Sequence, residues 1–110
     1  MGQTIDCTHA NITSCAGGAS NVGSLSPLGD GASGQADLAG NVWEWSLDWF
    51  FSSYISPCTD CTQVDPASNL RSLRGGAFDA NATEALASYR FVFLPTVRSA
   101  TFGLRCARAP

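Results

Sequence analysis

Residues 37–49 read Asp37-Leu38-Ala39-Gly40-Asn41-Val42-Trp43-Glu44-Trp45-Ser46-Leu47-Asp48-Trp49 and contain all three tryptophans of the 110-residue chain. Within this stretch, positions 43, 45, 47 and 49 are large and apolar, and they alternate with smaller or polar residues. A period of two is typical of a β-strand, whose successive side chains point to opposite faces. Because each aromatic side chain buries roughly 150–250 Å², we predict a strand whose aromatic face forms the centre of the core.

The segments on either side of this strand differ in character. Residues 1–36 are rich in Gly, Ser, Asn and Asp, which favour turns over regular structure, with one short strand expected at 22–25. After a second loop at 56–69, we expect short strands at 70–74, 89–94 and 101–108 and a short helical turn at 79–88. The length suits one small domain with much irregular structure.

The charge balance excludes two classes of partner. Charged residues make up only 14% of the chain, the net charge is −3, and all six cations are arginines. Nucleic acids and anionic membrane surfaces require a dense positive surface, and no apolar run approaches the ~20 residues that span a bilayer. We therefore expect no nucleic-acid or membrane partner, and the remaining candidates are a protein, a peptide or a small ligand.

Cysteine usage favours an oxidising, extracytoplasmic environment, although a reduced cytoplasmic protein remains the alternative. Cys7 with Cys15 and Cys58 with Cys61 suit local disulfides, which would leave Cys106 free and buried. Two other interpretations remain open. Residues 7, 9 and 15 offer a Cys, His, Cys metal set, and residues 58 and 61 offer half of a zinc site that lacks a second pair. His9, the only histidine, has no evident partners for a catalytic triad.

Four motifs follow one another in a specific order and spacing. They are Asp37 to Trp45, Leu73-Arg74-Gly75-Gly76-Ala77-Phe78, Tyr89-Arg90, and Phe102-Gly103-Leu104-Arg105-Cys106-Ala107. Together they resemble the C-terminal half of the formylglycine-generating enzyme, or sulfatase-modifying factor, family. The resemblance covers roughly residues 5–108. It implies an α+β, irregular, loop-rich C-type-lectin-like fold with short antiparallel strands and little helix.

The resemblance does not extend to the N-terminal half of the family. We therefore expect one domain, residues 1–110, that corresponds to the C-terminal half only. A domain without its other half leaves apolar surface uncovered, so self-association into a homo-oligomer is expected. Two Asn-x-Thr triplets, at 11–13 and 81–83, match the glycosylation sequon, but nothing else marks a eukaryotic secreted chain, and a bacterial source is expected.

The resemblance also implies a missing catalytic centre. The reactive cysteine pair of active family members would fall near Ala80 and Ala85, yet no cysteine occurs between Cys61 and Cys106. Without a thiolate there is neither a soft copper ligand nor a nucleophile. We therefore expect no catalytic residue, no copper and a non-catalytic binding module. The alternatives are an oxidoreductase component of the formylglycine-generating type or a truncated fragment of one.

Calcium is the cofactor that the resemblance implies. Matched residue by residue, its ligands would be the carboxylates of Asp37 and Glu44 and the carbonyls of Gly40 and Val42. Calcium takes about 6–8 oxygen ligands, and Gly40 permits the loop to curl. A weaker second site would use Asn11 and Ile12. The alternative interpretation is that Asp37 and Glu44 are simply solvated.

The segment after Gly76 supplies the candidate binding face. In the fold that the resemblance implies, this face carries Phe78, Asp79, Asn81, Glu84, Phe91, Phe93 and Arg98. Aromatic and small residues together suit recognition, and the alternative is that the phenylalanines are core residues. Arg74, Arg90 and Arg105 are expected to pair with carboxylates such as Asp48 or Asp79, or else to line a cleft for an anion.

Overall fold

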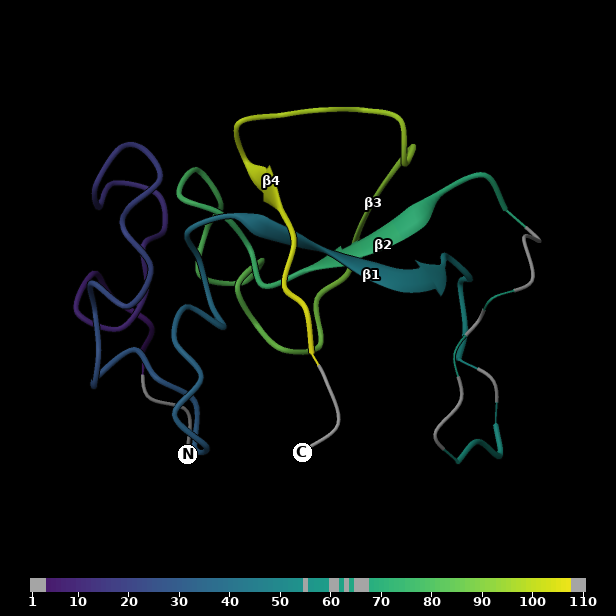
Figure 1. Cartoon of the computed structure of the whole chain (residues 1–110), viewed down its shortest axis with the longest axis horizontal. Coiled ribbons are helices and arrows are strands. Elements are labelled where there is room, and N and C mark those ends of the chain that lie inside the picture. The colour runs from purple at the N-terminus through teal and green to yellow at the C-terminus, as the bar shows by residue number, and fades with distance from the viewer. Residues whose placement is uncertain (1–3, 55, 60–61, 63, 65–67, 108–110) are drawn as a thin grey trace.

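A computed structural model describes residues 4–54, 56–59, 62, 64 and 68–107. Its strands are β1 (Trp43–Trp49), β2 (Arg71–Arg74), β3 (Phe91–Phe93) and β4 (Phe102–Gly103), which form one sheet in the order β3-β2-β1-β4 (Figure 1). The strands predicted around 43–49, 70–74, 89–94 and 101–108 are therefore present, with shorter bounds for the last two. Residues 22–25, predicted as a strand, form turns instead.

The described ranges contain no helix, so the helical part of the predicted α+β class is not supported by them. Residues 79–88 form a succession of turns. The Glu84 and Ala85 amides both donate to the Asn81 carbonyl, which makes a single turn that does not continue. Helix formation is cooperative and its first turn is unfavourable on its own, so the Ala-rich composition of this segment does not suffice.

The strand pairs are of both kinds. β1 with β2 and β2 with β3 are antiparallel, as predicted, whereas β1 with β4 is parallel, with Trp43 opposite Phe102. The prediction of antiparallel strands alone is therefore wrong for β4. A parallel partner requires a long connection, and here the chain passes through both β2 and β3 and then arches from β3 to the opposite edge of the sheet before β4 begins (Figure 1).

The predicted aromatic face of β1 holds only for the first half of the strand. Trp43 is buried and Trp45 half-buried, but the register shifts between Trp45 and Trp49. Leu47 is consequently 65% exposed. Trp49 is instead covered by Arg71, whose guanidinium carbon lies 4.1 Å from the ring centroid. A bulge changes which face a side chain points to, and the periodicity of the sequence does not reveal it.

The described residues form two small core clusters. The first joins Trp43 and Leu73 to Ala77 and Ala80, with partly buried aromatic rings packed around them. The second brings Ala10 and Ile12 of the N-terminal segment against Ala85. The N-terminal loops thus pack beside the sheet, at the purple and blue end of the chain in Figure 1, and a bridge between Asn11 and Gly40 connects them to the start of β1.

Candidate functional site

A groove of about 430 Å³ opens beside the sheet. Four aromatic residues of three strands line it, namely Trp43 of β1, Phe91 and Phe93 of β3, and Phe102 of β4. The remaining lining residues come from the turns between strands, and they are Asp79, Ala80, Glu84, Val97, Ser99 and Thr101. A volume in this range suits a small ligand or a few side chains of a larger one.

The sheet order explains why these aromatic rings meet. Trp43 and Phe91 stack with ring centroids 5.1 Å apart and planes 25° apart. Phe93 lies 5.6 Å from Phe102, at an interplanar angle of 61°. β4 pairs with one edge of the β1–β2 pair and β3 with the other. The rings from both edge strands therefore surround the hollow rather than form one flat layer.

The acidic side of the groove is shaped by a capping arrangement. The Oδ1 atom of Asn81 accepts hydrogen bonds from the amides of Thr83 (2.9 Å) and Glu84 (3.1 Å), and the Glu84 Oε2 atom accepts one from the Asn81 amide (2.8 Å). This reciprocal pattern fixes the turn. Asp79 is exposed, and its carboxylate has no hydrogen-bond or ion-pair partner within the part of the chain that the structure describes.

The predicted binding face is only partly the lining of this groove. Of its residues, Asp79, Glu84, Phe91 and Phe93 line the groove. Three others do not. Phe78 is half-buried, and its amide donates to the Asn41 carbonyl. Asn81 serves as the cap, and Arg98 is exposed.

Sequence reasoning missed Trp43 and Phe102 as lining residues, because it assigned the tryptophan to the core and left the phenylalanine in an ordinary strand. Trp43 is in fact 5% exposed and still borders the groove. A core aromatic ring that also forms a groove wall has no signal of its own in a sequence.

The positions implied for the catalytic cysteines are buried alanines. Ala80 lies in the lining of the groove, and Ala85 packs against Gly76. The lining residues within the described part of the chain include no cysteine. Cys106 lies elsewhere, forms no disulfide and is exposed, so the prediction that it is buried is wrong. It lies beyond the end of β4, after Leu104 and Arg105.

The predicted Cys7–Cys15 disulfide is present, with a Cα–Cα distance of 5.4 Å. A metal shared by these two cysteines and His9 is thereby excluded, since disulfide sulfurs are not thiolates. The predicted Cys58–Cys61 pairing involves Cys61, which lies outside the described residues.

His9 has more neighbours than the sequence indicated. Its Nδ1 atom lies 2.9 Å from both the Asp6 Oδ1 atom and the Thr8 Oγ1 atom. A triad needs its carboxylate and its hydroxyl on opposite ring nitrogens, so this cluster is not one. The Thr8 hydroxyl, followed by His9, lowers the pKa of Asp6 to about 2.

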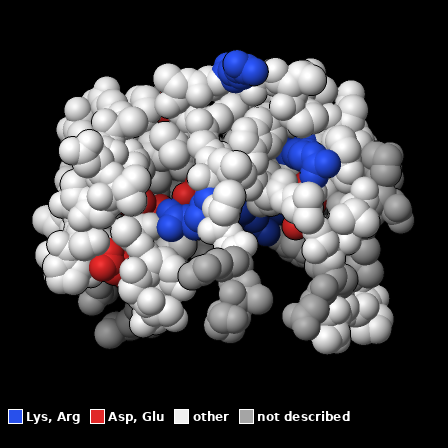
Figure 2. Space-filling view, viewed as in Figure 1, with Lys and Arg blue, Asp and Glu red and all other residues white. Residues whose placement is uncertain are grey.

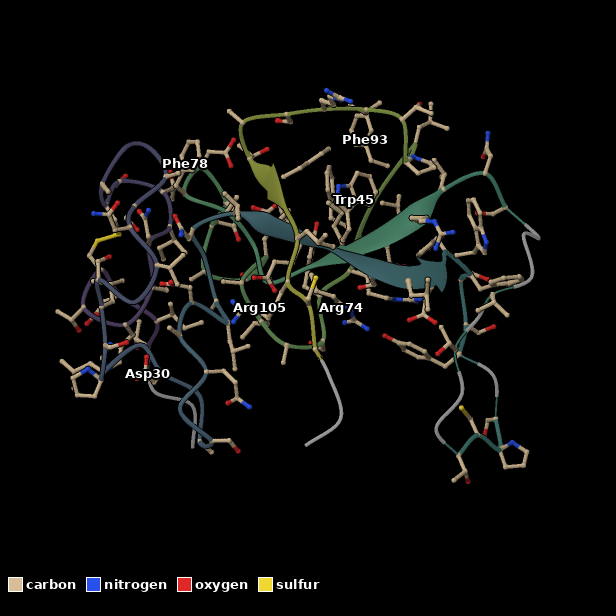
Figure 3. The ribbon with its side chains drawn as sticks, viewed as in Figure 1. Asp30, Trp45, Arg74, Phe78, Phe93 and Arg105 are labelled. Atoms are coloured by element: carbon tan, nitrogen blue, oxygen red, sulfur yellow. A yellow bond between two sulfur atoms is a disulfide. The ribbon has the colours of Figure 1, made fainter. Side chains whose placement is uncertain are left out.

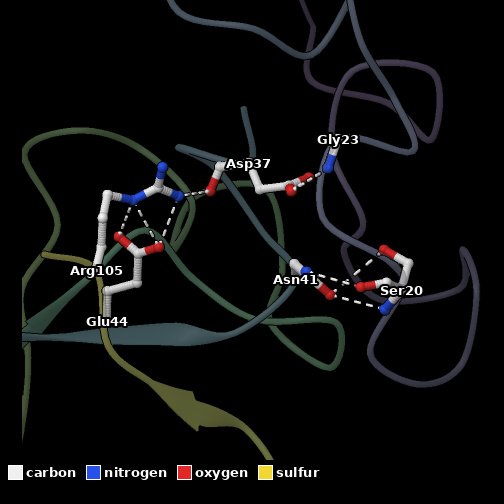
Figure 4. Close-up of polar contacts among 6 residues, drawn as sticks. All are labelled: Ser20, Gly23, Asp37, Asn41, Glu44 and Arg105. Atoms are coloured by element: carbon white, nitrogen blue, oxygen red, sulfur yellow. Dashed lines mark hydrogen bonds and ion pairs between the residues drawn. The ribbon is translucent and has the colours of Figure 1, made fainter. Parts of the chain in front are cut away.

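The loop before β1 is curled, as the calcium prediction requires. Asp37, Gly40 and Asn41 have positive φ angles of 54°, 78° and 67°. The Asp37 Oδ2 atom accepts a hydrogen bond from the Gly23 amide (2.8 Å), and the Asn41 side chain exchanges hydrogen bonds with Ser20 (Figure 4). The loop is thus tied to the N-terminal segment through side chains.

Arg105 contacts both residues that were predicted to supply carboxylate ligands, Glu44 through its carboxylate and Asp37 through its main-chain carbonyl. Its guanidinium contacts both Glu44 oxygens, and its Nη2 atom donates to the Asp37 carbonyl at 3.1 Å (Figure 4). The donor set of the loop still suits calcium in kind, because carboxylates and carbonyls are its preferred ligands. A cation bound by Glu44 would have to share this carboxylate with the positively charged Arg105 guanidinium.

The weaker predicted site has its oxygens already engaged. The Asn11 side chain is buried; its Oδ1 atom accepts from the Ala16 amide, and its Nδ2 atom donates to the Gly18 carbonyl. The Asn11 and Ile12 carbonyls accept from the Asn41 and Cys15 amides. These hydrogen bonds hold the loop in its fold, and a metal would have to share these oxygens with the amides that already donate to them.

The arginines find different partners from those predicted. Arg105 pairs with Glu44 rather than with Asp48 or Asp79. Arg74 donates to the carbonyls of Ala87 and Tyr89. Arg90 donates to the Phe51 carbonyl and lies 4.4 Å above the Tyr54 ring. Figure 2 shows how few charged side chains this face carries, with arginines beside acidic groups near its centre.

The comparison with known families decides the identity of the domain. The family described as "Sulfatase-modifying factor enzyme 1-like domain" matches residues 5–110. The chain belongs to this family. Its relatives include the formylglycine-generating enzyme of Thermomonospora curvata, which is 29% identical over 84% of this chain and 32% of its own length. The serine/threonine-protein kinase Pkn1 of Chlamydia trachomatis serovar L2 is 30% identical over 97% of this chain and 17% of its own.

A solved structure agrees with this family assignment. Treponema denticola variable protein 1 matches with a TM-score of 0.69 and 29% identity, over 88% of this chain and 34% of its own. The chain thus spans about a third or less of each of these proteins. This domain of the sulfatase-modifying factor family contains, in its described residues, no helix long and apolar enough to cross a membrane.

Proposed function

We propose that this sulfatase-modifying factor-like domain is a non-catalytic binding module whose binding site is the aromatic groove. The observation that carries the proposal is that Ala80 lines the groove, at the position where a thiol of the family would stand. An alanine supplies no nucleophile and no copper ligand. Four aromatic rings beside an open hollow instead provide contact area of the kind that interfaces use.

The test is an activity assay with a binding arm. A peptide with the sulfatase-type motif Cys-x-Pro-x-Arg is incubated with the protein, copper and oxygen, and aldehyde is measured by mass spectrometry. We expect no aldehyde. Aldehyde formation would overturn the proposal and favour the alternative suggested by the name of the Thermomonospora curvata relative, a formylglycine-generating oxidoreductase component.

Calcium is proposed as a stabiliser of the 37–44 loop rather than as part of the groove. Support comes from the curled backbone and from the donor set of Asp37, Gly40, Val42 and Glu44. Bound there, the ion would supply only charge neutralisation and loop rigidity. Because Arg105 already holds Glu44, binding in competition with this guanidinium is expected to be weak.

The cellular location and the association state of the domain are also proposed. A disulfide between Cys7 and Cys15 favours an extracytoplasmic location. The C-type-lectin-like character of the fold, a bacterial source and self-association remain predictions. Several large apolar side chains are exposed, among them Val22, Leu47 and Leu104, and these support the last of the three. Sedimentation velocity tests it, and a monomer at all concentrations would contradict it.

A further inference from the structure

The charged side chains described in the lining of the groove are all acidic. Among the residues that the structure describes, its lining contains two carboxylates, those of Asp79 and Glu84, and no lysine, arginine or histidine. Asp79 has no polar partner among the residues described, and Glu84 uses only its Oε2 atom for the Asn81 amide among the hydrogen bonds of its side chain. Carboxylates beside low-dielectric aromatic walls attract a cation more strongly than they would in open water. The charge therefore selects for a positively charged ligand.

The walls select for an organic cation rather than a metal ion. The rings of Phe91, Phe93 and Phe102 are inclined to one another, with angles of 46° between the first two and 61° between the last two. Rings inclined in this way can present their electron-rich faces to one object from more than one side. A cation within about 6 Å of an aromatic face is attracted by the ring quadrupole, and cages of this type are used for alkylated ammonium groups.

The protein already shows cation–ring contacts, but outside the groove. Arg71 lies over Trp49, and Arg90 lies over Phe50 and Tyr54. Among the described residues, no arginine lies over a ring that lines the groove. Phe93 is also 37% exposed, which leaves part of its surface open to a ligand.

We propose that the groove binds an alkylated ammonium group, with the aromatic rings around its methyl or methylene carbons and Asp79 and Glu84 near its charge. This inference rests on the proposed function and names the ligand class of the same site. A guanidinium is flat and suits a single stacked face. A compact, nearly spherical ammonium is a better match for inclined walls. A bare divalent ion is a poorer match, because the described residues contain no group of three or more His, Cys, Asp or Glu side chains placed to hold one.

The direct test compares choline with its uncharged isostere, 3,3-dimethylbutan-1-ol, by calorimetry and tryptophan fluorescence on the whole chain. Because the two differ in charge and hardly in shape, binding of choline about tenfold tighter is expected from the cation–π and carboxylate terms. Equal binding of the two, or no binding of choline, would overturn the inference. A second measurement replaces choline with a peptide that carries trimethyl-lysine, and it distinguishes a protein-borne ammonium from a free one. If either ammonium binds more tightly than its uncharged isostere, the inference is supported.

The variants separate the groove from the overall charge of the protein. Asp79→Asn and Phe93→Leu are each expected to weaken choline binding by about three- to tenfold. Asp30→Asn removes the same charge at a position far from Phe93 (Figure 3). The Asp30 side chain accepts a hydrogen bond from the Ser26 hydroxyl, and its substitution should leave the affinity for choline unchanged. An equal loss in Asp30→Asn and Asp79→Asn would show that only net charge matters and would contradict the proposal. Near-ultraviolet circular dichroism confirms that each variant is folded.

The outcomes also separate this inference from the proposed function. If no aldehyde forms from the sulfatase-type peptide and choline still does not bind, the ammonium inference falls while the binding-module proposal stands. If aldehyde forms, the binding-module proposal falls whatever the affinity for choline.

Discussion

Arg105 binds both carboxylate oxygens of Glu44, although the two residues lie 61 positions apart in the chain. Nε donates to Oε1 at 2.9 Å and to Oε2 at 3.0 Å, and Nη2 donates to Oε1 at 2.7 Å. These hydrogen bonds raise the pKa of Arg105 above its ordinary value. β4 pairs with β1 over only two residue pairs, so this ion pair fastens a strand that has few backbone contacts of its own.

Removal of either partner should loosen that attachment. Glu44→Gln and Arg105→Met are each expected to lower the free energy of unfolding by about 0.5–1 kcal/mol, since both side chains keep some exposure to water. Urea denaturation of both single variants and the double variant gives the coupling energy. A coupling near zero would show that the pair contributes nothing to stability. The Arg98→Met variant, at an exposed position outside the pair, is the matched control.

The same contact leads to a prediction about calcium. If Arg105 competes with calcium for Glu44, Arg105→Met should bind calcium more tightly than the native chain, and Glu44→Gln should bind it least. A ligand that binds only the folded state raises stability by RT ln(1 + [L]/Kd), about 2.7 kcal/mol at a hundredfold excess over Kd. Thermal melts with calcium and with chelator measure this. If calcium and chelator give the same melting temperature in the native chain and in both variants, the calcium proposal is refuted.

Asp6 supplies a test of local electrostatics. Its folded pKa of about 2 lies below the ordinary value of 3.8, chiefly because of the Thr8 hydroxyl. The hydrogen bonds to the charged Asp6 carboxylate therefore stabilise the folded state fully above the unfolded pKa, and this stabilisation is lost as the pH falls through about 2. Thr8→Val should raise the pKa of Asp6 towards 3.8, as followed by NMR titration. Thr13→Val removes a hydroxyl elsewhere and should leave it unchanged; an Asp6 that titrates near 3.8 in the native chain would contradict the assignment.

The strands were predictable because their signals are local. Alternation around Trp43 and Trp45, and the glycines that end β2, are visible within a few residues of sequence. Leu47 was placed wrongly because the register shift depends on how β2 pairs with β1. The helical turn at 79–88 was predicted from alanine content, whereas the chain there packs Ala80 and Ala85 into two separate clusters. Packing decides such a segment more than propensity does.

The lining of the candidate groove was predictable in part of its residues and less so in its geometry. Asp79, Glu84, Phe91 and Phe93 were named, because the family motif places them after Gly76. Trp43 and Phe102 were not, since their arrival at the groove depends on the parallel β1–β4 pair. The ion pair between Arg105 and Glu44 depends on the same pairing of β1 with β4. Long-range contacts of this kind have no periodic signature, and a sequence without the fold cannot supply them.

Gly40 gives the sharpest test of how the N-terminal segment is attached. Its φ of +78° is one that residues with a side chain rarely adopt. A Cβ atom at this position would collide with the main-chain carbonyl group of Asn11, because it would lie 2.9 Å from the carbonyl carbon. Gly40 also donates to the Gly75 carbonyl at 2.6 Å. Gly40→Ala should therefore combine backbone strain with a clash against main chain that cannot move away, at a cost of about 3 kcal/mol or more.

Gly34 is the matched control for this substitution, because it has nearly the same φ of +81° but no atom within 4 Å of a built Cβ. Gly34→Ala should cost only the left-handed conformation, roughly 1–2 kcal/mol. Urea denaturation of the two variants isolates the clash as their difference. If both lose the same stability, the close approach of Gly40 to Asn11 is absent in solution. The N-terminal loops would then have to be held by the side-chain hydrogen bonds of Asn41 and Asp37 alone.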